Sequence, residues 1–156
     1  MQRSKLALAL LALAGTAMLI PALSLAGQNT VEVTAKLKGS EEVPGPGDNK
    51  GKGEIQVFLK AKKEKVCFNL EISKLDPVMA GHIHKGVEGV AGKIKVTLFE
   101  TEILGEGAYE GCTRNVKSKL IAKMAEVPEK FYVNLHTAEY PDGAIRGQLT
   151  PLPIES

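Results

Sequence analysis

After residue 30 the chain alternates apolar and polar residues in short runs. From Val31 to Leu37 every second residue is apolar, and each residue between is threonine or charged. Successive side chains of a β-strand point to opposite faces, so this alternation predicts half-buried strands. Runs of the same kind cover residues 54–60, 66–72, 93–99, 131–137 and 144–150.

The segment between Asn115 and Pro128 departs from the strand pattern. Its apolar residues recur at helical spacing, which predicts one short amphipathic helix with Thr113 or Asn115 as N-cap. Glycine-rich stretches at 39–53 and 105–111 predict a long loop and a turn. Strands without βαβ alternation predict an all-β fold: an antiparallel β-sandwich or partly open barrel, immunoglobulin-like or superoxide-dismutase-like, with one short helix.

The first 26 residues have the composition of an export signal. Basic Gln2–Lys5 precedes an apolar run from Leu6 to Ile20, and small residues precede the expected cut after Ala26. The alternative is an uncleaved anchor, since Leu6–Ala26 is long enough to span a bilayer. Either reading places the rest outside the cytoplasm, periplasmic or secreted. Residues 27–156 then form a single domain with its core at about 31–149 and no further membrane span.

Charge excludes one class of partner. The chain has 20 basic and 18 acidic residues, and the leader holds two of the basic ones, so the mature domain is formally neutral. A nucleic-acid binder would show a basic excess, so no nucleic-acid partner is expected. Lysines cluster between Lys60 and Lys65. This cluster is interpreted as a solvated hairpin tip, with a patch for an anionic partner as the alternative.

The two cysteines predict one disulfide, Cys67–Cys112, because exported proteins form and keep such bonds. Alternation places Cys67 on the outward face of its strand, where the bond would tie down a surface loop. The alternative, a cysteine metal ligand beside the histidines, is disfavoured because Cys67 has no CxxC partner.

All three histidines lie in two predicted strands, His82 and His84 in residues 80–86 and His136 in residues 131–137. In an H-x-H strand both imidazoles project from one face, about 6–7 Å apart at the Cα atoms. His82, His84 and His136 therefore predict a three-nitrogen site for copper or zinc, the metals that suit such a set.

Several polar residues accompany the histidines. If the last two strands pair, Asn134 and Arg146 share the histidine face, which predicts a small-ligand or anion pocket. Glu139, Asp142 and also Glu88 are candidates for a further ligand. Arg146 is an awkward neighbour for a cation unless an acid lies between them.

Four segments together resemble the CHRD domain family. They are Gly39-Ser-Glu-Glu-Val-Pro44, Gly81-His-Ile-His-Lys-Gly86, Phe131-Tyr-Val-Asn-Leu-His-Thr137 and Tyr140-Pro-Asp-Gly-Ala-Ile-Arg-Gly-Gln-Leu149. This module is named from its repeats in chordin and also occurs as single-domain exported bacterial proteins. The resemblance implies an extracytoplasmic all-β module and assigns no reaction.

Three functions follow from these residues. The first is a non-catalytic module that binds copper, zinc or a small ligand at the three histidines. The second is a structural or protein-interaction domain with an envelope or extracellular partner, whose histidines serve only the fold. The third is a copper-dependent enzyme similar to superoxide dismutases, which carry an H-x-H on a β-sandwich but use more histidines and an aspartate. Whether the protein is an enzyme stays open, and the shortage of ligands favours the first two.

Overall fold

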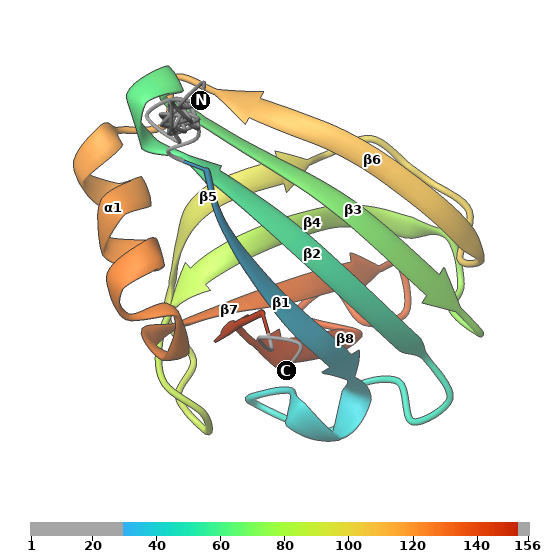
Figure 1. Ribbon diagram of the computed structural model, residues 1–156. Coiled ribbons are helices and arrows are strands. Elements are labelled where there is room, and N and C mark those ends of the chain that lie inside the picture. Colours follow the sequence, from blue (N-terminus) through green and yellow to red (C-terminus); the bar gives the residue numbers. More distant parts are fainter. Residues whose placement is uncertain (1–29, 153–156) are drawn as a thin grey trace, which may run out of the picture.

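The structure is a computed structural model that describes residues 30–152, so the predicted leader and the last four residues lie outside it (Figure 1). The strands are β1 (Thr30–Lys38), β2 (Lys52–Lys60), β3 (Lys65–Ser73), β4 (Val78–Lys85), β5 (Lys93–Phe99), β6 (Gly107–Arg114), β7 (Phe131–Thr137), β8 (Ile145–Gln148) and β9 (Thr150–Pro151). The helix is α1 (Ser118–Glu126), and three 3-10 turns are η1 (Gly39–Glu41), η2 (Ala61–Lys63) and η3 (Pro128–Lys130). Between residues 30 and 152, no helix has the length and apolar character to cross a bilayer.

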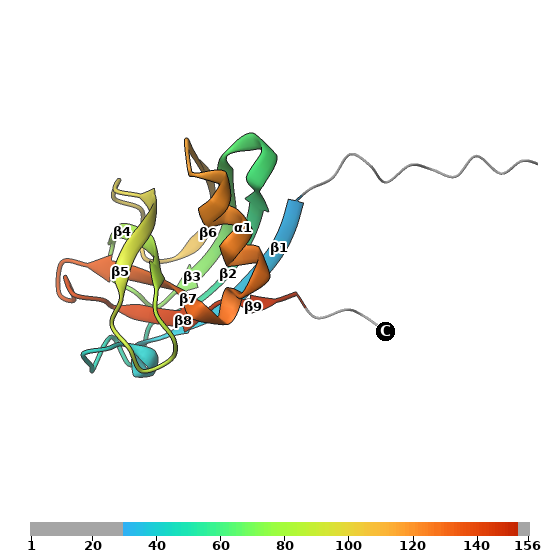
Figure 2. The ribbon, with the colours of Figure 1, turned by 90° about the vertical axis from the view of Figure 1, so that its left-hand side faces the viewer.

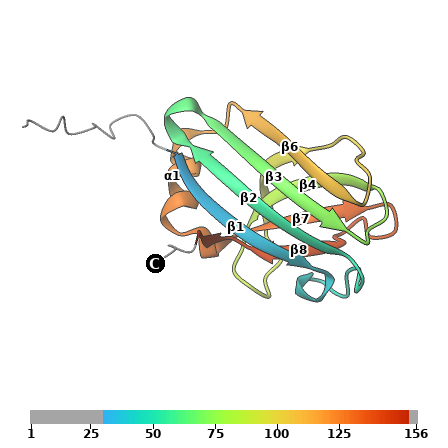
Figure 3. The same ribbon diagram turned by 45° about the vertical axis from the view of Figure 1, so that its right-hand side comes forward.

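The strands form one antiparallel sheet that curls into a nearly closed barrel. Their order is β5-β4-β7-β8-β1-β2-β3-β6, with β9 beside β1. Figure 3 shows β1, β2, β3 and β6 in front of β4, β7 and β8. The predicted antiparallel β fold with one short helix is confirmed, and so is the hairpin that β2 and β3 form around the lysine-rich turn.

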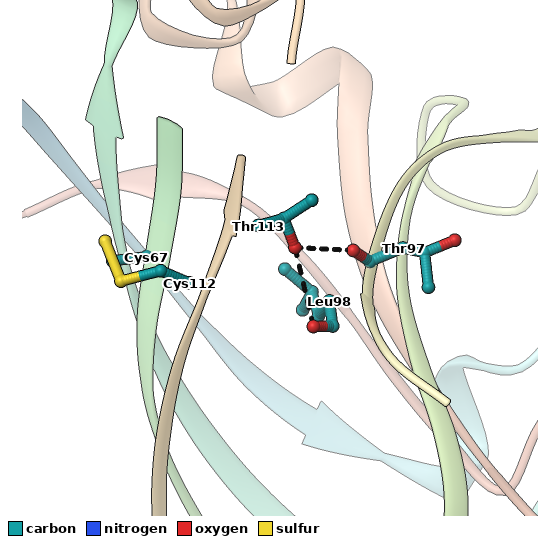
Figure 4. The surroundings of a disulfide bond; sticks show 5 residues. All are labelled: Cys67, Thr97, Leu98, Cys112 and Thr113. Atoms are coloured by element: carbon teal, nitrogen blue, oxygen red, sulfur yellow. Dashed lines mark hydrogen bonds between the residues drawn. A yellow bond between two sulfur atoms is a disulfide. The ribbon is translucent and has the colours of Figure 1, made fainter. Parts of the chain in front are cut away.

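The two end strands of the sheet, β5 and β6, meet at a seam. No strand ladder joins them in the described part of the chain. Instead the Thr113 hydroxyl of β6 donates to the Thr97 carbonyl of β5 at 2.6 Å and lies 3.4 Å from the Leu98 carbonyl (Figure 4). A side-chain contact thus closes the barrel where backbone pairing stops.

The barrel interior is apolar, as the alternation predicts. Ile55 and Val57 of β2, Ile83 of β4 and Leu135 of β7 are fully buried. Helix α1 contributes Ile121 and Met124 to the same core, and both are inaccessible to solvent. Packing at these positions, rather than helix propensity, holds so short a helix in place.

The predicted helix caps are wrong. The N-cap is Lys117, and no side chain caps the helix. Asn115 has a positive φ of 60°, and the next residue, Val116, is buried in the core. The chain therefore turns at Asn115 and packs Val116 before the helix begins at Ser118.

Two further details differ from expectation. Residues 107–111 form part of β6 rather than a turn, and the Phe68 ring packs where a side chain at Gly111 would lie. Ile94 is an apolar residue of the alternating run 93–99, which predicts that it points inward, but it is 51% exposed. A β-bulge between Ile83 and His84 shifts the register, pairs Ile94 with His84 and turns it outward.

The Cys67–Cys112 disulfide is confirmed (Figure 4). The two residues face each other across β3 and β6. The expectation that the bond fastens a surface loop is wrong, because residues 107–114 are a strand. The bond holds the last strand of the sheet to its neighbour.

Replacing both cysteines by alanine should lower the free energy of unfolding by about 4 kcal/mol, the loop-entropy value for the 45-residue separation. Urea denaturation of the double variant beside oxidised wild type measures the loss. Wild type treated with reductant is the matched control and should approach the variant. An unchanged midpoint in both would contradict the prediction.

Candidate metal and ligand site

Strands β4, β7 and β8 lie side by side and place the predicted site residues on one face. The register sets His82 opposite Asn134, and Asn134 opposite Arg146. The intervening residues Ile83 and Val133 point into the core. The predicted sharing of a face by the histidines, Asn134 and Arg146 is therefore what the structure shows.

This face is covered rather than open to solvent. His82, His84 and Asn134 are buried, and Arg146 is only 2% exposed. The loop of residues 86–92 covers one part, since Gly92 bonds to both His84 and Tyr132. The segment after β1 covers another part through Glu42. The alternation correctly predicted an orientation away from the barrel core, but not this second layer.

The three imidazoles converge. His82, His84 and His136 each offer one ligand nitrogen, and these atoms lie within 4.8 Å of one another. His82 Nδ1 and His136 Nε2 form the shortest contact, at 3.1 Å. Residues 54 positions apart in sequence thus supply one cluster.

Backbone carbonyls fix the tautomers of two imidazoles. His84 Nδ1 donates to the Gly92 carbonyl at 2.9 Å, and His136 Nδ1 donates to the Pro141 carbonyl at 2.8 Å. A carbonyl only accepts, so the proton of each neutral ring is on Nδ1 and the lone pair is on Nε2. Hydrogen bonds of this kind orient histidine ligands in metal sites.

The electrostatics keep these rings neutral. Burial lowers the pKa of His84 and of His136 below the usual histidine value, and the charge of protonated His82 would lower both further. The carbonyl hydrogen bonds partly oppose the effect. Both imidazoles are therefore unprotonated near neutral pH, the state that a metal ion needs.

Arg146 does not point at the histidines as a free charge. Its guanidinium lies 3.5 Å from the centre of the Tyr132 ring, and Nη2 donates to the carbonyls of Val87 and Val90 at 3.0 and 3.1 Å. On the histidine side the Tyr132 ring stacks with His84, with centres 4.8 Å apart. Arg146 therefore holds the covering loop over the histidine beside it.

Glu42 is a member of this face that sequence reasoning missed. It is 5% exposed, and Asn134 Nδ2 donates to both of its carboxylate oxygens at 2.9 and 2.8 Å. Burial raises the pKa of Glu42 to about 7, although the positive Arg146 and the Asn134 hydrogen bond lower it. The only sequence signal was its place in the Gly39–Pro44 motif, to which no role was given.

Gly143 makes room for this acid. Its φ is +147°, and a Cβ atom there would meet the Glu42 carboxylate and the Asn134 amide. A glycine at this position, which ends the Tyr140-Pro-Asp-Gly143 segment, is thus required both by the backbone and by the close approach of Glu42.

The other candidate ligands lie outside the cluster. Glu139 and Asp142 are exposed and do not belong to the three-histidine group, although the Asp142 charge raises the pKa of His136. Glu88 lines a groove with Arg146 on the outer surface. The exposed Glu100, not singled out from sequence, lies nearest to His82, with its Oε1 atom 3.7 Å from Nε2.

Unpartnered polar atoms gather on this face. Within residues 30–152, the buried side-chain atoms that lack a hydrogen-bond partner are His82 Nε2, His84 Nε2, Asn134 Oδ1 and Arg146 Nη1. Buried polar groups are nearly always paired in folded proteins, so such a concentration needs an explanation. An additional group bound among them would supply it.

Substituting Glu42 with glutamine should change how stability depends on pH. A carboxyl whose pKa rises from 4.5 to about 7 on folding stabilises the native state fully at acid pH, and that contribution is lost as pH rises through about 7. The glutamine variant has no carboxyl at this position, so its stability does not fall in this way as pH rises. Its free energy of unfolding, relative to wild type, should therefore increase by about 3 kcal/mol between about pH 4.5 and about pH 8.

Urea denaturation at several pH values measures this difference. The histidines contribute a pH dependence of stability opposite in sign to that of Glu42. Because they are present in both proteins, their contribution largely cancels when the variant is compared with wild type. A difference that stays constant with pH would show that Glu42 has an ordinary pKa.

The comparisons with known proteins agree with this arrangement. The family model of the CHRD domain matches residues 33–149, which run from within β1 to just past β8 and include every residue of the histidine face. No curated protein and no solved structure matches the chain. Since the family model covers most of the sequence, the protein belongs to the CHRD domain family.

Proposed function

We propose that this CHRD domain is an exported, non-catalytic module that binds one copper or zinc ion through His82, His84 and His136. The observation that carries the proposal is the convergence of three ligand nitrogens within 4.8 Å. Two of the rings already have their Nδ1 protons committed to carbonyls, so the lone pair of each is on Nε2, the atom that would bind a metal.

The spacing of one pair of nitrogens, those of His82 and His136, suits a shared ion. Metal–nitrogen distances of about 2.0–2.1 Å place two ligands of a tetrahedral ion about 3.3 Å apart. His82 Nδ1 and His136 Nε2 lie 3.1 Å apart. Binding through Nδ1 would move the His82 proton to Nε2, where the Glu100 carboxylate is the nearest acid.

The positive Arg146 is compatible with a cation here. Its guanidinium is held against Tyr132 and the loop carbonyls, and Glu42, whose pKa of about 7 leaves it partly ionised at neutral pH, offsets part of the charge. Neutral imidazoles suit copper and zinc alike, so the ligand set supports both metals.

Metal titration of the purified protein tests the proposal. We expect one zinc ion per chain by calorimetry, and nitrogen couplings in the electron paramagnetic resonance spectrum of the copper(II) form. Replacing both His82 and His84 by alanine removes two of the three ligands, and should lower the affinity by at least about 100-fold. Wild type that binds neither metal would leave the histidines as a structural cluster.

A matched control uses acids from another part of the barrel. Glu54 and Glu71 face each other across β2 and β3. Replacing both by glutamine removes two potential surface ligands and should leave one ion bound per chain. If this variant loses the ion while the histidine variant keeps it, the assigned site is wrong.

Export is supported by the leader-like composition of residues 1–26 and by the Cys67–Cys112 bond, which oxidising compartments favour. We expect the extracytoplasmic protein to begin at Gly27. N-terminal sequencing of that fraction checks the cut. An intact leader on protein recovered from the membrane would indicate the anchored form.

A further inference from the structure

A separate basic pocket lies where the barrel seam meets helix α1. It has a volume of about 630 Å³ and is lined by residues of β5, β6 and α1, with Lys85 and Phe131 from β4 and β7. Figure 2 shows α1 beside this end of the barrel. None of its lining residues belongs to the histidine cluster.

Five of its lining residues are cations, and none is a carboxylate. The cations are Lys85, Lys95, Arg114, Lys117 and Lys123. Lys123 donates to Glu126 at 3.0 Å, and within residues 30–152 the other four form no ion pair. In a mature domain with equal numbers of acids and bases, this concentration of positive charge is specific to the pocket.

The contrast with a second pocket, at the opposite end of β2 and β3, supports this reading. That pocket is lined by Lys50, Lys52 and Lys74, but also by three carboxylates that offset their charge. At the seam, charge accumulates further, because Arg114 lies opposite Lys65 in the β3–β6 pairing. Like charges placed directly across a sheet destabilise it, so nothing in the fold itself favours this arrangement.

Helix α1 adds to the positive potential. Its first turn contains no acidic residue, and no side chain caps it. Residues 115–117, which lead into the helix, line the pocket. The amino end of a helix attracts anions, so it adds to the charge of the side chains, although the Glu64 carboxylate lies 3.2 Å from the Ser118 hydroxyl and offsets part of this effect.

The pocket also has an apolar floor. Val96 and Phe131 line it and are otherwise buried. A volume of about 630 Å³ is in the range of small-molecule sites and exceeds the needs of a single inorganic ion. Arginine binds phosphate oxygens in a bidentate manner, and several cations favour a group with more than one negative charge.

We propose that this pocket binds a phosphate group carried by a small organic ligand, with the organic part against Val96 and Phe131. A soluble phosphate ester and the headgroup of an anionic lipid share this chemistry. The lysine-rich turn η2 lies next to α1, where Ser118 donates to the Ala61 carbonyl, so the cluster noted in the sequence extends the same basic surface.

The first probe is inorganic phosphate, titrated into the purified protein while the backbone amide chemical shifts are monitored by nuclear magnetic resonance. We expect saturable shifts at Thr97, Thr113 and Asn115. Replacing Lys95 and Arg114 by glutamate should weaken binding at least about tenfold, because charge-assisted hydrogen bonds become repulsive contacts. Replacing Lys50 and Lys52 by glutamate changes net charge equally and should alter the affinity less than about twofold.

A vesicle co-sedimentation experiment distinguishes a lipid headgroup from a soluble phosphate ester as the ligand. Co-sedimentation with phosphatidylglycerol but not phosphatidylcholine vesicles, abolished by the Lys95 and Arg114 substitutions, would assign the pocket to a lipid headgroup. Phosphate binding without vesicle binding would assign it to a soluble ester. The His82 and His84 double variant should bind phosphate as wild type does, which separates this pocket from the metal proposal.

Absence of saturable shifts at the three amides would overturn the proposal. Equal weakening by both glutamate pairs would overturn it too, because it would indicate only a general response to net charge. If the Lys95 and Arg114 glutamate variant fails to fold, the glutamine pair at the same positions replaces it and should still weaken binding.

Discussion

The buried guanidinium of Arg146 organises the outer face of β4, β7 and β8. A charged group at 2% exposure is tolerated only when other groups replace its water. Here two loop carbonyls accept from Nη2, the Tyr132 ring covers the guanidinium and Glu42 lies near it, while Nη1 has no partner within residues 30–152. The two carbonyls belong to the 86–92 loop, and Glu42 belongs to the segment after β1. Both segments therefore lie across a sheet face that would otherwise be solvated. Burial of the histidines follows from the same covering.

The same covering sets two opposed pH responses. Burial raises the pKa of Glu42, and it lowers the pKa of His84 and of His136. Acidification protonates the carboxyl to its neutral form, which lowers the free-energy cost of its burial. It also favours the charged form of the imidazoles, which raises the cost of theirs. Near neutral pH this face therefore has one acid close to its titration point, beside rings that stay neutral.

Much of this arrangement could be predicted from the sequence because it depends on local periodicity. Alternation predicted most of the strands, though not β6, and it predicted the shared face of the histidines with Asn134 and Arg146. Glu42 could not be found that way. It meets Asn134 across 92 residues, and its motif lies in a glycine- and proline-rich loop with no period. The predicted inward orientation of Ile94 was also wrong, since a bulge is not visible in the pattern of apolar residues.

The same limit of local periodicity applies to the histidine cluster. The H-x-H spacing predicts two imidazoles on one side of a strand, but their tautomers depend on the Gly92 and Pro141 carbonyls. These acceptors come from loops, whose paths are fixed only by tertiary contacts. The sequence therefore predicted which histidines could share one site, whereas the hydrogen bonds that orient them became visible only in the folded chain.

Strand β6 has a consequence for how the protein behaves among other copies of itself. It is an end strand, paired along one side with β3 and held to β5 through the Thr113 hydroxyl. An end strand offers backbone groups to which another chain can add a strand. The Cys67–Cys112 bond pins that strand in place. An oxidising environment therefore protects the protein against intermolecular β-sheet formation, beyond its effect on the stability of a single chain.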